Sequence, residues 1–171
     1  KIAAELTNLK IIGIDCHIGS QITDKDPYVE STNRLLKFVD SVDEIDKTNF
    51  HIDLGGGIGI CYEDEELPIL NDFFSSILQP IEEWSKKKSL KTPKIIFELG
   101  RSIVGPAGLI VCEVVALKKG NDENDKNFIV VDAAMNDLMR PALYNAYHEI
   151  FPIINLENNL SKIRWDIVGP I

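Results

Sequence analysis

The segment KIIFELGRSIVGPAG (residues 94–108) places a carboxylate, a glycine and an arginine directly after a short run of apolar residues. The apolar run predicts a buried strand, and the residues after it predict a loop. A carboxylate is costly to bury without a partner, and an arginine beside a glycine favours an anion or a planar group that approaches the backbone closely. We therefore interpret Glu98, Gly100 and Arg101 as part of a binding site.

Two upstream segments have the same design. LKIIGIDCHIGS (residues 9–20) and NFHIDLGGGIGI (residues 49–60) each run from an apolar strand into a loop of small and polar residues. Residues 28–45 carry apolar side chains at roughly helical spacing, and residues 68–88 predict a second helix that Pro80 either kinks or splits. This alternation of strands and helices is typical of parallel strands joined by crossover helices.

Polar residues gather where each of the three predicted strands ends. His17 and Ser20 follow the first strand, Gly55–Gly57 follow the second, and Glu98 and Arg101 follow the third. In parallel α/β folds, and above all in (β/α)₈ barrels, the chemistry lies at the carboxyl ends of the strands. Three consecutive strands of this kind predict one site at that edge of the sheet.

Each of these motifs also has a structural interpretation. The glycine run can turn its N–H groups toward a phosphate, or it can be a plain tight turn; it completes neither the Walker nor the dinucleotide pattern. His17 can stack on a planar ligand or serve the fold alone. Glu98 can hold a ring nitrogen or form a core pair with Arg101. The acidic run at residues 62–67 reads as a solvated loop.

The alternation of predicted strands and helices ends after residue 105. We therefore place a domain boundary near residues 105–108. Residues 108–120 and 127–135 predict two strands joined by a short polar turn, hence an antiparallel hairpin. A polar segment, residues 155–163, precedes the last predicted strand, residues 164–170.

The segment NDLMRPALYNAYHE (residues 136–149) places Arg140 before a proline and Tyr144 four residues later. If a helix begins there, both side chains point the same way. A surface loop and helix without a functional role is the alternative.

The composition excludes several classes of function. A formal net charge of −9 and the lack of a basic face argue against nucleic-acid binding. Apolar runs stay below the roughly 20 residues that a membrane span needs. Three scattered cysteines and three scattered histidines form neither a disulfide framework nor a metal site, so we expect no metal and a cytoplasmic protein.

Taken together, GIDCHIGSQI, DLGGGIG, ELGRSIVGPAG, VDAAMNDLMRPALYNAYH and DIVGPI, in this order, resemble the diaminopimelate decarboxylase family. This family belongs to the alanine-racemase-like, fold-type III group of pyridoxal phosphate enzymes. The resemblance covers essentially the whole chain. It implies an α/β fold in which residues 1–107 are the last part of a (β/α)₈ TIM-type barrel and residues 108–171 begin a C-terminal β-domain.

The resemblance also implies a role for each motif. His17 would stack on the ring of pyridoxal 5'-phosphate, Glu98 would pair with the ring nitrogen, and Arg101 would reach both phosphate and substrate. Arg140 and Tyr144 would bind the distal end of meso-diaminopimelate. The remaining implied cofactor contacts are Ser20, Gly55, Gly56, Gly57, Leu99 and Gly100, where Leu99 replaces the proline usual in the family.

The family pattern places the Schiff-base lysine before Lys1 and the proton-transfer cysteine after Ile171, so we expect no catalytic residue in this stretch and an excised part of a longer chain. The complete protein would form L-lysine and carbon dioxide as a homodimer. Two alternatives stay open. One is a related decarboxylase of the ornithine, arginine or carboxynorspermidine type, and the other is a catalytically dead paralogue that acts as a binding partner.

Overall fold

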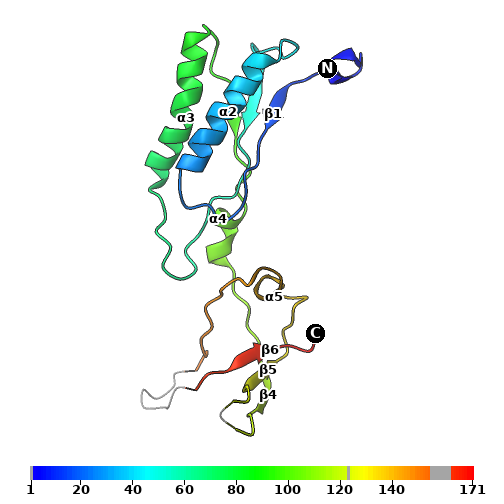
Figure 1. The fold of residues 1–171 in the computed structure, drawn as a ribbon, viewed down its shortest axis with the longest axis vertical. Coiled ribbons are helices and arrows are strands. Elements are labelled where there is room, and N and C mark those ends of the chain that lie inside the picture. Colours follow the sequence, from blue (N-terminus) through cyan, green and yellow to red (C-terminus); the bar gives the residue numbers. More distant parts are fainter. Residues whose placement is uncertain (1, 123, 155–162) are drawn as a thin grey trace. The chain divides into compact units, whose positions relative to one another are not determined.

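The computed structural model describes residues 2–122, 124–154 and 163–171 (Figure 1). The chain divides into two units, Lys1–Gly108 and Leu109–Ile171. No helix among the described residues is both long and apolar enough to cross a membrane.

The first unit is built on three short parallel strands. They are β1 (Gly13–Asp15), β2 (His51–Asp53) and β3 (Lys94–Ile96), and they lie side by side in that order. Helix α2 (Asp26–Ser41) connects β1 to β2, and helix α3 (Leu70–Lys87) connects β2 to β3. The parallel strands with crossover helices that the sequence predicted are therefore present.

Helices α2 and α3 pack against each other and share one core (Figure 1). Apolar residues recur along each helix at intervals of three and four, which gathers them on one face. The buried residues on these faces are Tyr28, Thr32, Leu35, Leu36 and Val39 of α2, and Phe73, Ile77, Ile81, Trp84 and Ser85 of α3.

Pro80 lies inside α3, which runs unbroken from Leu70 to Lys87. A proline in a helix interior costs about 3 kcal/mol, because it removes one backbone hydrogen bond and crowds the preceding turn. The helix persists because its flanking residues Ile77 and Ile81 are at most 1% exposed and gain their burial only if the helix continues. The alternative that Pro80 splits this segment was therefore wrong.

Short helices complete the first unit at its two ends. Helix α1 (Ile2–Glu5) precedes β1, and α4 (Arg101–Val104) follows β3 and leads into a turn of 3₁₀ helix at Gly105–Ala107. Helix α4 begins at Arg101, so Arg101 lies directly after the loop that follows β3.

The second unit is a three-stranded sheet in the order β4-β5-β6. Strand β4 (Val114–Lys118) pairs antiparallel with β5 (Phe128–Val131), as the predicted hairpin requires, and β6 (Asp166–Val168) pairs parallel with β5. Helix α5 (Arg140–Tyr144) lies in the connection between β5 and β6. Apart from residue 163, the polar segment expected at residues 155–163 lies outside the described residues.

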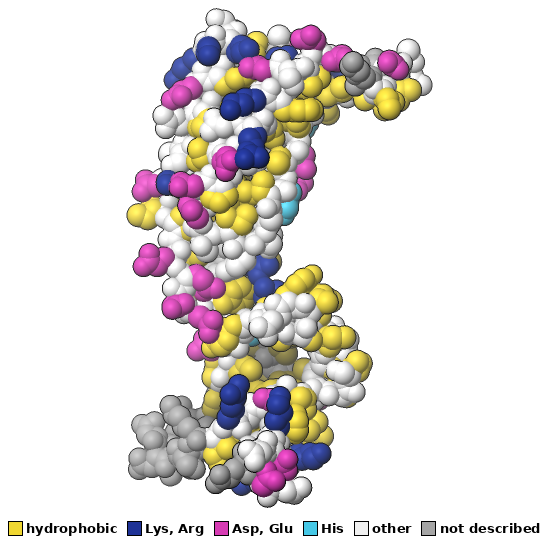
Figure 2. Space-filling model, viewed as in Figure 1, with side chains coloured by type: hydrophobic (Ala, Val, Ile, Leu, Met, Phe, Trp, Pro, Cys, Tyr) yellow, Lys and Arg dark blue, Asp and Glu magenta, His cyan; other side chains and the backbone are white. Residues whose placement is uncertain are grey.

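The second unit has little core of its own. Every residue of β4 is exposed, and Val131 is the one buried apolar residue among the described residues of this unit. Figure 2 shows hydrophobic side chains at the surface, interspersed with side chains of both charges. A sheet normally buries one face against a second layer, and the described residues of this unit bury little of this sheet.

Candidate functional site

The parallel pairing brings three loops to one edge of the first sheet. Asp15, Asp53 and Ile96 stand opposite one another at the ends of β1, β2 and β3. His17, Gly55 and Glu98 each follow two residues later, so the register alone places them in neighbouring loops. The predicted meeting of polar residues at the carboxyl ends of the strands has its basis in this register.

The glycine run is required by the close approach of these loops. Gly55 has φ +66° and its N–H donates to Oδ1 of Asp53 at 2.9 Å, while its carbonyl accepts the N–H of Glu98 at 2.7 Å. A Cβ on Gly56 would lie 2.0 Å from the carbonyl oxygen of Glu98. A Cβ on Gly57, which has φ +97°, would lie 2.0 Å from a backbone carbonyl oxygen of the first loop. Glycine at these positions therefore allows the backbones of the three loops to approach closely, where a Cβ would clash.

His17 is held by the same turn. The N–H of Gly56 donates to Nδ1 of His17 at 3.2 Å, so Nδ1 must be unprotonated and the ring proton lies on Nε2. A Cβ on Gly55 would lie 2.9 Å from the Cα of His17. The imidazole therefore lies directly against the glycine run, with its side chain exposed at the edge of the sheet.

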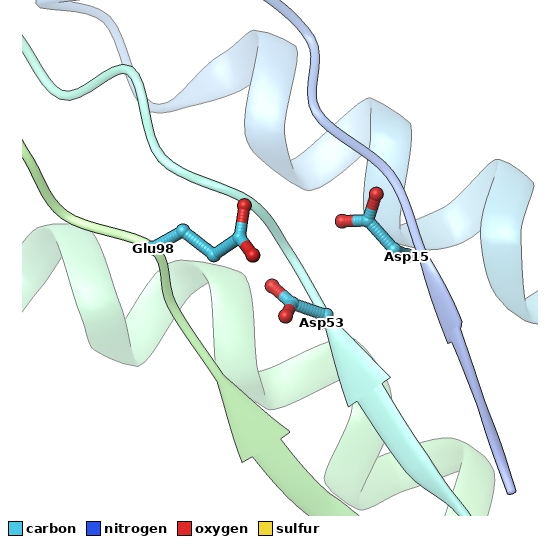
Figure 3. Close-up of side chains that lie close together, drawn as sticks. All are labelled: Asp15, Asp53 and Glu98. Atoms are coloured by element: carbon cyan, nitrogen blue, oxygen red, sulfur yellow. The ribbon is translucent and has the colours of Figure 1, made fainter.

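Three carboxylates gather beside this turn. Oxygen atoms of Asp15, Asp53 and Glu98 all lie within 4.8 Å of one another, and Figure 3 shows their side chains directed into the same space. Asp15 and Glu98 are exposed and Asp53 is half-buried. Clustered negative charge at these distances attracts a positive group, whether a cation or a protonated ring nitrogen.

Arg101 does not make the core pair with Glu98 that was one interpretation of the sequence. Its Nη1 donates to the hydroxyl of Tyr62 at 2.8 Å, and its Nη2 donates to Oγ of Ser20 at 2.8 Å. The guanidinium thereby joins the three loops that follow β1, β2 and β3.

Tyr62 and Asp15 lie at this edge of the sheet, and the sequence did not indicate either of them. The acidic run at residues 62–67 reads as a solvated loop, and its acidic side chains are mostly exposed, but Tyr62 is half-buried and contacts Arg101. The available signal was one aromatic residue three positions after Gly59 in an otherwise charged loop.

The loop after β3 also shows how the chain accommodates Leu99. Its half-buried side chain packs against the hydrophobic core of the first unit. The next residue, Gly100, has no atom within 4 Å of the position that a Cβ would take. The backbone at Gly100 is therefore open to close approach by a ligand.

Arg140 and Tyr144 belong to the second unit. Both lie on α5, four residues apart, which places them on neighbouring positions of one helical face. Nη1 of Arg140 lies 3.2 Å from Nε2 of His148, a contact that the sequence did not indicate, and Tyr144 is 68% exposed. The helix that the sequence required for this arrangement is present.

Comparison with known proteins defines the class. Residues 1–105 match the family model described as "Pyridoxal-dependent decarboxylase, pyridoxal binding domain". The chain therefore belongs to the pyridoxal-dependent decarboxylase family.

The similar proteins are more specific. Diaminopimelate decarboxylase of Neisseria meningitidis serogroup A is 47% identical over 99% of this chain and 39% of its own length. Solved structures of diaminopimelate decarboxylase match from Helicobacter pylori in complex with L-lysine (34% identity, TM-score 0.79, 99% of this chain and 39% of that one) and from M. jannaschii (34%, 0.82, 99% and 38%). The chain spans about two fifths of the length of these relatives.

Proposed function

We propose that the chain is a part of a diaminopimelate decarboxylase, and that the complete protein converts meso-diaminopimelate to L-lysine and carbon dioxide. The observation that carries the proposal is the 47% identity to diaminopimelate decarboxylase over 99% of the chain. The strand-end loops support it, because the residues that the family assigns to the cofactor meet at one edge of the sheet.

The residues at this edge fit pyridoxal phosphate. The backbone N–H groups of Gly57 and Gly100 have no acceptor among the described residues, and both can donate to a phosphate. The hydroxyl of Ser20 and the guanidinium of Arg101 add a donor and a positive charge. These four groups come from three loops, which is typical of a phosphate site at the end of a parallel sheet.

Glu98 and His17 serve the ring of the cofactor. Bound there, pyridoxal phosphate supplies a protonated heteroaromatic ring that takes up the electron pair left when carbon dioxide departs. The carboxylate of Glu98 would accept a hydrogen bond from the protonated ring nitrogen, and the neighbouring carboxylates of Asp15 and Asp53 would favour the protonated state of that nitrogen. His17 would cover one face of the ring, and the N–H of Gly56 holds its imidazole in place.

Arg101, Arg140 and Tyr144 bind the substrate in this proposal. Diaminopimelate has two amino acid head groups, and the distal carboxylate needs a fixed positive partner. Arginine offers a planar fork that matches a carboxylate with two hydrogen bonds. Arg140 and Tyr144 supply these contacts from helix α5.

At the level of the fold, we propose that residues 1–107 form the last part of a (β/α)₈ barrel and residues 108–171 the start of a C-terminal β-domain. The parallel β1-β2-β3 sheet with its crossover helices and the separate β4-β5-β6 sheet support this division. The complete protein would act as a homodimer, as the family resemblance implies.

The test is to purify the full-length protein with pyridoxal phosphate and to measure carbon dioxide and L-lysine from meso-diaminopimelate. Ornithine, arginine and carboxynorspermidine serve as competing substrates, and protein without added cofactor serves as the control. We expect turnover of meso-diaminopimelate to exceed that of each competitor by at least tenfold in kcat/KM. Preference for another diamino acid would replace the proposal with a sibling decarboxylase.

A further inference from the structure

Tyr62 lies outside the residues that the family resemblance assigns to the site, yet its hydroxyl contacts Arg101. Nη1 of Arg101 donates to this hydroxyl at 2.8 Å, and the guanidinium carbon lies 5.7 Å from the centre of the tyrosine ring. Both side chains are half-buried. The contact therefore fixes one end of a long cationic side chain at the edge of the sheet.

The loop that carries Tyr62 is itself tied down. Oε2 of Glu65 accepts the backbone N–H groups of Tyr62 at 2.7 Å and of Glu63 at 2.9 Å. These N–H groups hold the pKa of Glu65 below its usual range, with that of Glu63 contributing most, so the carboxylate stays charged at neutral pH. The loop therefore closes on its own carboxylate and presents the tyrosine in one position.

Gln21 ties this loop to the loop that follows β1. Its Nε2 donates to the carbonyl of Ile60 at 2.6 Å, and its Oε1 accepts the N–H of Ile60 at 3.2 Å. Gln21 also has φ +58°, a left-handed conformation that is uncommon for a residue other than glycine. Gln21 thus holds the loop that carries Ser20 at a fixed distance from the loop that carries Tyr62.

Arg101 bridges this separation with both terminal nitrogens. Nη2 donates to Ser20 while Nη1 donates to Tyr62, and a guanidinium has five N–H groups in one plane. The remaining N–H groups of Arg101 have no acceptor among the described residues and lie in the same plane. An arginine that is already ordered loses less rotamer freedom when an anion binds, which strengthens binding without a new contact.

We propose that Tyr62 is a positioning residue that orients Arg101 for an anionic oxygen group. This inference rests on the proposed function for the source of that group. Two sources share the chemistry, namely the phosphate of the cofactor and the carboxylate that the substrate retains. Tyr62 acts through Arg101 in either case, and the two sources are separated by experiment.

The test uses the full-length protein with Tyr62→Phe, which removes only the hydroxyl. Pyridoxal phosphate is titrated into the apoprotein, and L-lysine, which keeps one amino acid head group of the substrate, is titrated into the holoprotein by calorimetry. We expect about tenfold weaker binding in one of the two titrations, the size expected when a charged group loses a hydrogen bond. The titration that changes identifies the anion.

A mutant cycle separates positioning from general damage. In an Arg101→Lys background, Tyr62→Phe should change the same dissociation constant by less than twofold, because the group it orients is gone. Glu63→Gln, an exposed side chain on the same loop, is the matched control and should leave both titrations unchanged. If Tyr62→Phe does not fold, Glu65→Ala takes its place, since it frees the loop but keeps the hydroxyl.

Two results overturn the inference. One is binding within twofold of the parent in both titrations, and the other is an equal Tyr62→Phe effect with and without Arg101. A parent protein that releases no carbon dioxide from meso-diaminopimelate would overturn the proposed function instead. The titrations would still report on Tyr62, because they measure binding and not turnover.

Discussion

The backbone N–H of Gly56 donates to Nδ1 of His17 at 3.2 Å, across 39 positions of sequence. The contact exists because the loops after β1 and β2 leave neighbouring parallel strands at the same level. It fixes the histidine as the Nε2-protonated tautomer and sets its ring against the glycine run. The glycines thus permit the close approach of the loops and also lie in the proposed site, and substitution can separate these two roles.

Three glycine-to-alanine variants of the full-length protein make that separation. Gly56→Ala should lower the Tm of the apoprotein by several degrees, because its Cβ would lie 2.0 Å from the carbonyl oxygen of Glu98. Gly100→Ala should leave this Tm unchanged, because no atom lies within 4 Å of its Cβ, but should weaken pyridoxal phosphate binding.

Gly108→Ala is the control for this series. It also meets nothing within 4 Å, and it lies outside the proposed site, so both Tm and cofactor affinity should equal those of the parent. Thermal scans and cofactor titration measure the two quantities. Unchanged cofactor affinity in Gly100→Ala would remove that glycine from the phosphate site.

Glu98→Gln tests the proposed role of the carboxylate at the ring nitrogen. The amide keeps the size of the side chain but loses the charge that favours a protonated ring nitrogen, so kcat should fall by roughly 100-fold. Affinity for pyridoxal phosphate should change far less, because the phosphate contacts remain. Steady-state kinetics and cofactor titration of the full-length protein measure both. Turnover within a factor of two of the parent would contradict the role.

Glu82→Gln is the matched control for this variant. Glu82 is an exposed carboxylate on helix α3, so its neutralisation should leave kcat and cofactor affinity unchanged. A loss of activity in both variants would point to general charge effects and not to Glu98.

The sequence predicts the first unit well because its signals are local. Strands were predicted from runs of consecutive apolar residues, and helices from apolar residues with a period near 3.6. Each of these patterns lies within about 20 residues of chain. Their alternation implies parallel strands, and the parallel register then places His17, Gly55 and Glu98 in adjacent loops. The antiparallel β4–β5 hairpin followed from the same reasoning, since a short polar turn leaves no room for a crossover helix.

The partners of Arg101 could not be predicted, because they depend on side-chain reach across loops. Glu98 lies three residues away in sequence, yet the guanidinium is bound to Tyr62 and Ser20, which are 39 and 81 residues away. Several acceptors lie within reach of so long a side chain, and no local pattern distinguishes among them. The choice between a kink and a split at Pro80 stayed open for a related reason, since the burial that keeps α3 unbroken comes from packing against other elements.

Asp40 links helices α2 and α3, and its pKa makes this link dependent on pH. Its Oδ1 accepts a hydrogen bond from Nε1–H of Trp84 at 3.1 Å and lies 3.0 Å from Nζ of Lys88. The hydrogen bond from Lys88 chiefly, and that from Trp84, hold the pKa of Asp40 below its ordinary value of 3.8. The unfolded chain therefore takes up this proton first, and the stabilisation is full above the unfolded pKa and lost as pH falls through the folded one.

Asp40→Asn should consequently lower the Tm at pH 7 by a few degrees, corresponding to about 0.5–1 kcal/mol for a partly exposed pair. The Tm difference from the parent should shrink as the pH falls below the ordinary aspartate pKa of 3.8. Asp43→Asn, an exposed position after α2, should show no difference at either pH. A difference that persists unchanged at low pH would mean that the charge of Asp40 is not what stabilises the helix pair.

The choice of substrate should depend on two side chains of helix α5. Arg140 and Tyr144 lie one turn apart, and His148 lies beside the guanidinium of Arg140. Losing one charge-assisted contact to a desolvated carboxylate should cost about 2–4 kcal/mol, or roughly 30- to 1000-fold in kcat/KM. Arg140→Ala should show this loss on meso-diaminopimelate, and Arg140→Lys should recover little, because a lysine cannot form the planar fork.

Both Arg140 variants are made in the full-length protein, and circular dichroism and cofactor absorbance verify that the fold and the cofactor site survive. The loss should fall mainly on substrates that carry a distal carboxylate, so the ratio of kcat/KM for meso-diaminopimelate to that for ornithine should drop in parallel. Tyr144→Phe should lower the same ratio less, because it removes one neutral hydroxyl and leaves the charge. If both Arg140 variants keep a parental ratio, Arg140 serves the structure of the second unit, and the distal carboxylate must be bound elsewhere.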